Sequence, residues 1–210
     1  MNAIYHSVSY GAGAAVIALL AGYLATSIIF NRRKTPVLAS FQDVVVSVPP
    51  GIPPVIFGLG LLLVFAYGPV RLYGTPWPIV ILYATIILPF ATRLQLVAMT
   101  GMGTNLMEAG AASGAGLFRR AFRIQLPLIR PAIGYTVALA FVLASVEFSG
   151  SLLLRTGNTQ VMGTQLYDLY EFGSYPLTAV MAVIMCLVTG TGVSIAILIG
   201  GPGVLRQQVR

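Results

Sequence analysis

The sequence predicts an all-α integral membrane protein with about five transmembrane helices and one polar loop on the cytoplasmic side. Of its 210 residues, 57% are hydrophobic and only 8% are charged. A soluble domain of ordinary composition carries about 25% charged residues, so this chain is too poor in charge to cover itself with a water-soluble surface. The five apolar segments form one transmembrane domain over residues 1–210, with the lipid bilayer as its surroundings.

The predicted spans follow from length and apolar composition, because a spanning helix needs roughly 20 mostly apolar residues. The second span is short, and it opens from the segment SVPPGIPP, whose prolines predict a kinked or re-entrant entry. The last span has the clearest pattern, because no charge interrupts residues 175–205. The five predicted spans are Ser7–Phe30, Pro54–Val70, Trp77–Ala98, Pro131–Leu154 and Pro176–Ile199.

Basic residues predict the orientation, because Lys and Arg are enriched in short cytoplasmic loops. One set of alternate loops and the span ends beside them carry Arg32, Arg33, Lys34, Arg93, Arg119, Arg120, Arg123, Arg130, Arg206 and Arg210, and the opposite side carries Arg71 and Arg155. This asymmetry predicts an N-terminus outside the cell and a C-terminus in the cytoplasm. It also accounts for most of the net charge of +7, so no nucleic-acid partner is needed to explain it.

The polar loop occupies about residues 100–130 and reads TNLMEAGAASGAGLFRRAFRIQLPLIRPAI from Thr104 to Ile133. Asn105 and Glu108 have the spacing of a capping box, which predicts a helix over Leu106–Ser113. Gly114 stands where a helix can end in a left-handed conformation. The loop therefore begins as a short helix followed by a sharp turn.

A second short helix is predicted over Leu117–Ile124, with Phe118 and Phe122 four residues apart on one face. Pro127 is predicted to block its continuation, and Pro131 suits the first turn of the next span. From composition alone, this loop is a basic amphipathic connector that rests on anionic lipid.

The order of residues in EAGAASGAGLFRRAFRIQLP favours a different interpretation, because it resembles the EAA signature of permease subunits of binding-protein-dependent ABC importers. Positions Glu108, Ala109, Gly114, Leu126 and Pro127 match the signature, with Phe122 and Pro131 in their usual places, while Gly110 stands where the family usually has alanine. The resemblance implies the fold of a type I importer and a loop that docks into a cytoplasmic ATPase. The residues it assigns to ATPase coupling are Glu108, Ala109, Gly110, Gly114, Phe118, Phe122, Leu126 and Pro127.

The resemblance extends over nearly the whole chain and implies a set of partners. These are a cytoplasmic ABC ATPase dimer that binds ATP and Mg, a second permease copy or homologous half, and an external substrate-binding protein in a bacterial inner-membrane system. No cofactor is expected on this chain. The stretch 147–176 is most similar to the ferric-iron branch, with thiamine, polyamine, molybdate or sulfate as alternative substrates. The family's usual first span is absent, which fits either a five-span subunit or the C-terminal part of a longer permease.

No enzymatic site is predicted. The only lysine, Lys34, does not follow the glycines of a GxxxxGK[ST] loop, so ATP hydrolysis is expected on a separate subunit. The only histidine, His6, excludes a His-pair metal site within the chain, and no metal site is expected.

The sharpest polar feature within a predicted span is Glu147, with Ser149 and Ser151 close to it in LASVEFSGSLLL. An ionisable group at this depth is costly and usually faces a pathway or a partner. Two interpretations remain equal: these residues line the translocation pathway, or Glu147 braces a helix against an arginine or a backbone group. An alternative function is an ion-coupled secondary transporter with Glu147 as proton relay. A purely structural assembly subunit has no positive support.

The outer loop 155–176 carries Asp168 and Glu171 among the aromatic residues Tyr167, Tyr170 and Phe172. This pattern predicts a short amphipathic helix that lies on the membrane surface. An interfacial aromatic anchor is favoured over contact with substrate.

Overall fold

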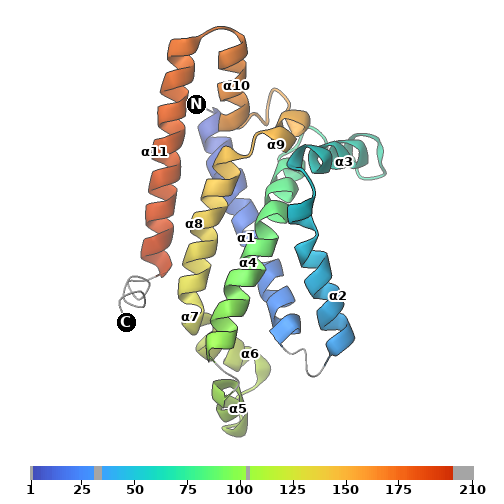
Figure 1. Ribbon diagram of the computed structural model, residues 1–210, viewed down its shortest axis with the longest axis vertical. Coiled ribbons are helices and arrows are strands. Elements are labelled where there is room, and N and C mark those ends of the chain that lie inside the picture. The colour runs from blue at the N-terminus through green and yellow to red at the C-terminus, as the bar shows by residue number, and fades with distance from the viewer. Residues whose placement is uncertain (1, 31–34, 103–104, 201–210) are drawn as a thin grey trace.

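The computed structural model describes residues 2–30, 35–102 and 105–200, and every regular element in those ranges is a helix. Figure 1 shows a bundle of long helices, with short helices at both ends. The helices that run along the long axis are α1 (Asn2–Phe30), α2 (Pro36–Ser47), α4 (Trp77–Met102), α8 (Arg130–Val146) and α11 (Tyr175–Gly200). The shorter elements are η1 (Pro49–Gly51), α3 (Pro54–Tyr67), α5 (Asn105–Ala112), α6 (Leu117–Arg120), η2 (Ala121–Gln125), α7 (Leu126–Leu128), α9 (Ser149–Leu154) and α10 (Met162–Glu171).

The described helices confirm a membrane-spanning architecture. Three of them are long and apolar enough to cross a bilayer by themselves: Asn2–Phe30, Trp77–Met102 and Tyr175–Leu198. Two bent pairs of helices raise the number of crossings to five if each pair is one span. An odd number of crossings leaves the start of α1 and the end of α11 directed to opposite ends of the bundle, as Figure 1 shows.

The core lies where α1, α4 and α8 meet, and small residues let these helices approach closely. Ala14 and Ala18 of α1 are almost fully buried, as are Ala91 of α4 and Ala140 of α8. A Cβ atom added to Gly22 would lie 3.1 Å from the Cβ of Ala91. Helices in lipid associate through such close van der Waals packing, because the hydrophobic effect does not drive them together there.

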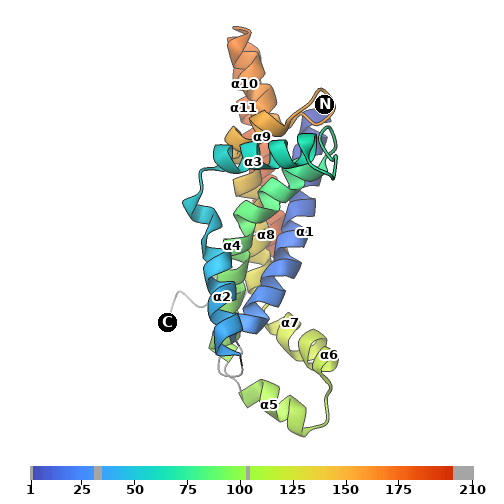
Figure 2. The same cartoon turned by 90° about the vertical axis from the view of Figure 1, so that its right-hand side faces the viewer.

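The prediction for the second span is wrong in its position. The predicted Pro54–Val70 corresponds to α3, which has only 14 residues and lies at one end of the bundle, nearly across the long axis in Figure 2. The crossing is made together with α2, and the two are bent by 105° around the proline-rich segment. The kinked entry is therefore confirmed, but the sequence analysis assigned no helix to residues 36–47.

The prediction of one continuous fourth span is also wrong. The predicted Pro131–Leu154 is broken at Glu147, where α8 ends, and the chain resumes as the short helix α9. Gly150 of α9 packs directly on α3, because a Cβ atom on Gly150 would lie 2.7 Å from the backbone oxygen of Pro54. A Cβ atom on Gly58 of α3 would likewise lie 2.7 Å from the backbone oxygen of Gly150. Both positions therefore require glycine for this close backbone approach.

The helix predicted in the outer loop is present as α10, but its predicted orientation is wrong. Figure 1 shows α10 running alongside the beginning of α11 rather than across the bundle. Gly173, with a φ of 70°, provides the tight turn between the two helices.

Candidate functional site

The polar loop forms a helix–turn–helix segment that projects from one end of the bundle, as Figure 2 shows. The turn that follows α5 has the geometry predicted for Gly114, whose φ is 75°. The Gly114 N–H donates to the carbonyl of Ala111 and the Ala115 N–H donates to the carbonyl of Gly110, both at 3.0 Å. These two bonds are those of a Schellman motif, which satisfies free carbonyls at the end of a helix.

Gly110, the position that departs from the signature, lies where α5 meets the second half of the loop. A Cβ atom on Gly110 would be 2.9 Å from Cδ1 of Ile124 and 3.4 Å from the side chain of Arg120. Glycine therefore lets the two halves of the loop approach closely, in addition to its effect on helix propensity. The predicted capping pair of Asn105 and Glu108, and the side chain of Phe118, lie outside the described side chains.

The second half of the loop differs from its prediction, because the helix does not stop before Pro127. It widens into the π-helical element η2, in which the N–H of Leu126 bonds to the carbonyl of Ala121. It then passes through Pro127 and ends at Leu128. A proline inside an α-helix loses one hydrogen bond and clashes with the preceding turn. The wider π turn placed directly before Pro127 relieves this conflict.

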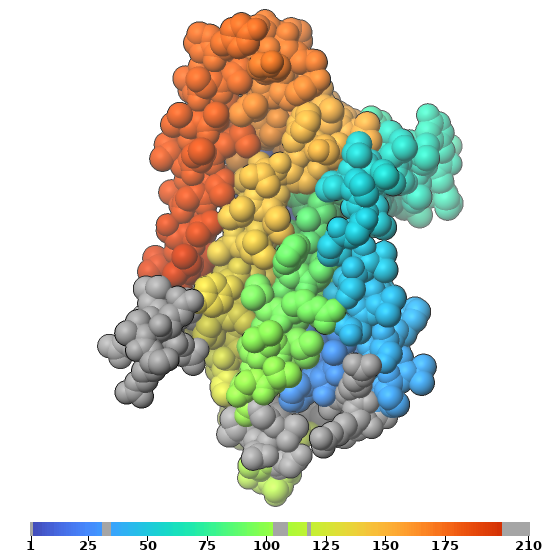
Figure 3. Space-filling model, viewed as in Figure 1, coloured from blue at the N-terminus to red at the C-terminus, as the bar shows by residue number. Residues whose placement is uncertain are grey.

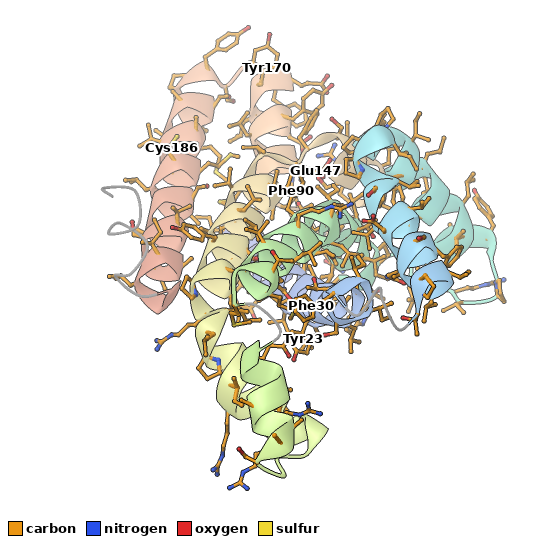
Figure 4. All side chains as sticks on the ribbon, turned by 60° about the horizontal axis from the view of Figure 1, so that its bottom comes forward. Tyr23, Phe30, Phe90, Glu147, Tyr170 and Cys186 are labelled. Carbon is orange, nitrogen blue, oxygen red and sulfur yellow. The ribbon has the colours of Figure 1, made fainter. Side chains whose placement is uncertain are left out.

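Gln125 links the loop to the spanning helices, and the sequence analysis did not single it out. Its Oε1 accepts a hydrogen bond of 2.7 Å from the hydroxyl of Tyr23 in α1. Its Nε2 lies 3.0 Å from the sulfur of Met99 in α4. Gln125 is only 6% exposed, so it connects this part of the loop to two spanning helices through buried contacts. Figure 4 shows Tyr23 on the part of α1 nearest the loop.

A hollow of about 290 Å³ lies between α1 and the second half of the loop. Two of the predicted coupling residues, Phe122 and Leu126, line it together with Tyr23 and Gln95 of the spanning helices. Phe122 is 64% exposed. Phe122 thus stays largely exposed beside the hollow that it shares with α1, and the docking of these residues on an ATPase stays a prediction.

Glu147 lies at the break between α8 and α9, as Figure 4 shows. The N–H of Gly150 donates to its Oε1 at 2.7 Å, and the N–H of Ser151 donates to its Oε2 at 3.1 Å. These N–H groups belong to the first turn of α9, where intrahelical partners are missing. Ser151 is fully buried, whereas Ser149 is exposed. Both carboxylate oxygens of Glu147 are thus engaged by backbone, and a pathway role for these three residues stays a prediction.

The outer loop is held to the start of α1 by polar contacts. Asp168 accepts a hydrogen bond from Arg155 through Oδ1 and one from Gln160 through Oδ2, both at 2.6 Å. The N–H of Met162 donates to the hydroxyl of Ser7 at 2.8 Å. Since both oxygens of Asp168 are occupied within the chain, this geometry indicates a structural role for the loop.

Arg93 lies inside the predicted span Trp77–Ala98, although its charge was counted with the basic loop that follows this span. It lies within α4, nine residues before Met102, and its Nη2 is 2.7 Å from Oδ1 of Asp43 in α2. The same Nη2 donates to the hydroxyl of Ser47 at 2.7 Å. The two charged side chains remain 46% and 32% exposed. The sequence analysis missed this pair, because it assigned no helix to residues 36–47, where Asp43 lies.

Comparison with known proteins identifies the wider group. The profile of a family described as "Binding-protein-dependent transport system inner membrane component" matches residues 16–204. A protein of Salmonella typhimurium named as a candidate 2-aminoethylphosphonate transport system permease is 22% identical over 188 residues, covering 90% of this chain and 70% of that protein. A sulfate transport system permease of Synechocystis sp. is 28% identical over 176 residues, covering 74% of this chain and 63% of that protein. A spermidine/putrescine permease of Escherichia coli is 22% identical over 191 residues, covering 90% of this chain and 70% of that protein.

Two solved structures have the same fold. One is an inward-facing form of the MetNI methionine ABC transporter, with a TM-score of 0.72 and 14% identity, covering 94% of both chains. The other is a bacterial ABC transporter involved in alginate import, with a TM-score of 0.75 and 17% identity, covering 100% of this chain and 79% of that one. The all-α type I importer fold predicted from the sequence is thus confirmed. The relatives named above are phosphonate, sulfate and polyamine permeases, so they do not support the ferric-iron branch in particular.

Proposed function

Because the chain belongs to the family of binding-protein-dependent transport system inner membrane components, we propose that it forms one half of the translocation path of an ATP-driven importer. A second copy or a homologous half completes the path. An external binding protein delivers the solute, and a cytoplasmic ATPase dimer holds ATP and Mg and drives transport. Alternating access then follows from a shift between inward-facing and outward-facing states.

The observation that carries this proposal is the projecting loop with its link to the spanning helices. Its turn is fixed by Gly114, and its second half is bonded to α1 and α4 through Gln125. A segment that rests passively on lipid has no need of such a link. A movement imposed by an ATPase requires one, because coupling is carried by packed and hydrogen-bonded contacts between elements. The alternative of a secondary transporter with Glu147 as relay gains no support, since that carboxylate caps α9.

The solute belongs to a small set of candidates. The resemblance of residues 147–176 points to ferric iron, whereas the names of the relatives favour the alternatives sulfate and polyamine and add 2-aminoethylphosphonate. All are small and charged, and an external binding protein would do most of the selection among them.

Copurification in mild detergent tests the proposed function. We expect an ATPase subunit to remain attached to the chain, and an external binding protein to join the complex when solute is added. A variant that lacks residues 105–128 and has a short glycine–serine linker in their place is expected to insert in the membrane but to lose the ATPase. If this variant retained the ATPase, docking through the loop would be wrong.

A further inference from the structure

The hollow between α1 and the second half of the loop has almost entirely apolar walls. Tyr23 and Gln95 are the only polar residues in its described lining. Both donate within the chain, Tyr23 to Gln125 at 2.7 Å and Gln95 to the carbonyl of Leu19 at 3.3 Å. The volume of about 290 Å³ is near the lower end of the range of ligand pockets, about 300–1,000 Å³. The hollow therefore suits part of one hydrocarbon chain better than a charged or polar group.

The hollow opens along the outer face of α1. Val16 and Leu20, which line it, are 56% and 65% exposed, and Leu24, one turn further along α1, is 65% exposed. Figure 3 shows the face formed by α8, α4 and α2, where α1 is largely covered. Figure 2 shows α1, α6 and α7 together on the side of the bundle away from α2. Since α1 is long and apolar enough to cross a bilayer, the hollow continues into an apolar surface that is suited to lipid.

Basic side chains flank the hollow on its loop side. Arg119 and Arg123 are exposed and lie four residues apart in α6 and η2. They lie three residues and one residue from Phe122, which lines the hollow, and neither forms an ion pair within the described part of the chain. An apolar hollow beside two guanidinium groups matches the acyl chain and the phosphate of an anionic phospholipid. Basic pockets beside spanning helices on the cytoplasmic side bind such headgroups.

We propose that an anionic phospholipid binds at this hollow, with one acyl chain between α1 and the loop and its phosphate against Arg119 and Arg123. Its place in the cytoplasmic leaflet rests on the proposed function, which puts the loop in the cytoplasm. The acyl chain lies beside Tyr23, the partner of Gln125. The lipid thus forms part of the contact between the loop and α1, next to the hydrogen bond that links them.

Tryptophan fluorescence of the chain in vesicles tests this binding, because brominated acyl chains quench a tryptophan that they contact. Trp77 is the only tryptophan, so Trp77→Phe combined with Leu20→Trp places a single reporter at the rim of the hollow. The vesicles contain brominated phosphatidylglycerol or brominated phosphatidylcholine, diluted in unbrominated phosphatidylcholine. We expect the anionic lipid to quench the reporter at a mole fraction about fivefold lower, the factor that one basic residue near anionic lipid contributes.

A reporter on α11 provides the matched control. Val183 is 58% exposed and lies in a stretch without charge, so Trp77→Phe combined with Val183→Trp should be quenched equally by the two lipids. Equal quenching at Leu20→Trp as well would overturn the proposal. A preference for the anionic lipid of the same size at both positions would also overturn it, because the preference would then not belong to the hollow.

Two further changes separate the arginines from the hollow. Arg119→Gln combined with Arg123→Gln should abolish the preference at Leu20→Trp and leave the quenching at Val183→Trp unchanged. Ala121→Phe, which fills the hollow from its lining and keeps both arginines, should lower the quenching of Leu20→Trp by both lipids. A preference that survives the loss of the arginines would overturn the proposal, as would full quenching in a filled hollow.

A protein that covers the hollow is the competing occupant. Photoreactive benzoylphenylalanine in place of Leu20, in cells that carry the complete importer, should form a product with phospholipid. A product with the ATPase or with the second permease half would show that a protein occupies the hollow and would overturn the proposal. Loss of the ATPase from the wild-type complex would contradict the proposed function and would leave the quenching result unchanged, so the two failures are distinguishable.

Discussion

Replacing Gly114 by alanine tests the loop through a single backbone angle. Gly114 has a φ of 75°, a region that residues with a Cβ atom rarely adopt. A Cβ atom added there meets no described heavy atom within 4 Å. The substitution therefore causes no collision, and its cost is confined to the left-handed conformation, at about 1–2 kcal/mol.

This cost has a defined consequence for the loop. A penalty of about 1–2 kcal/mol changes a conformational equilibrium about 5- to 30-fold. The equilibrium between the closed turn, with the hydrogen bonds of Gly114 and Ala115 formed, and an open turn would shift by that factor toward the open turn. The two halves of the loop would then lose their fixed angle. We expect Gly114→Ala to insert normally and to lower solute uptake, with ATPase copurification reduced or with hydrolysis no longer driving transport. Gly114→Asn should be milder, because asparagine tolerates the left-handed region better.

Gly116 provides the matched control, two residues further along the same loop. Its φ is not in the left-handed region, and a Cβ atom there also meets no described atom within 4 Å. Gly116→Ala should therefore transport like the wild type. Equal uptake by Gly114→Ala and Gly116→Ala would refute the role of the turn. A connector that merely rests on lipid predicts that equality, together with a dominant effect of removing Arg119, Arg120 and Arg123.

Three further predictions address orientation, transmission and the helix break. In a Cys186→Ser background, which removes the exposed native thiol, Gly157→Cys should react with an impermeant thiol reagent outside intact cells and Gly116→Cys should not; reversed labelling would overturn the orientation. Tyr23→Phe removes one hydrogen bond to the loop, worth about 0.5–1.5 kcal/mol, so uptake should fall by up to about tenfold with the ATPase still attached; unchanged uptake would exclude this link. In Glu147→Gln, the amide NH₂ faces one of the two backbone N–H groups that now donate to the carboxylate. The free energy of unfolding in detergent should therefore fall by about 1–3 kcal/mol, and an unchanged value would contradict the capping role.

The sequence predicted best those features that depend on local chemistry. The bounds of α11 follow from an uninterrupted apolar run. The positive φ of Gly114 follows from its position at the end of a helix. By contrast, α2 has only 12 residues and includes Asp43, so it fails any test for a full-length span. A sequence pattern does not reveal that two short helices bent by 105° make one crossing.

Features that depend on distant partners could not be predicted in the same way. Gln125 is a polar residue in a polar loop, and only the fold brings it to Tyr23, which is 102 positions away in the sequence. Arg93 likewise lies within a predicted span, and only the fold brings Asp43 of α2 beside it. The count of basic residues still indicates the orientation without Arg93, because the remaining nine outnumber the two on the other side.

The charges within the spans show why depth alone does not identify a pathway. Depth makes any charge costly, but the arrangement that offsets this cost differs between the two cases. For Glu147 the offset is complete within the chain, because both oxygens accept N–H groups that α9 would otherwise leave unpaired. For Arg93, Asp43 and Ser47 both use Nη2, and the side chain stays 46% exposed. The remaining solvation must come from outside this chain, from water, a solute or the second permease half. The two charges differ in how their cost is offset, and depth by itself assigns neither of them to a pathway.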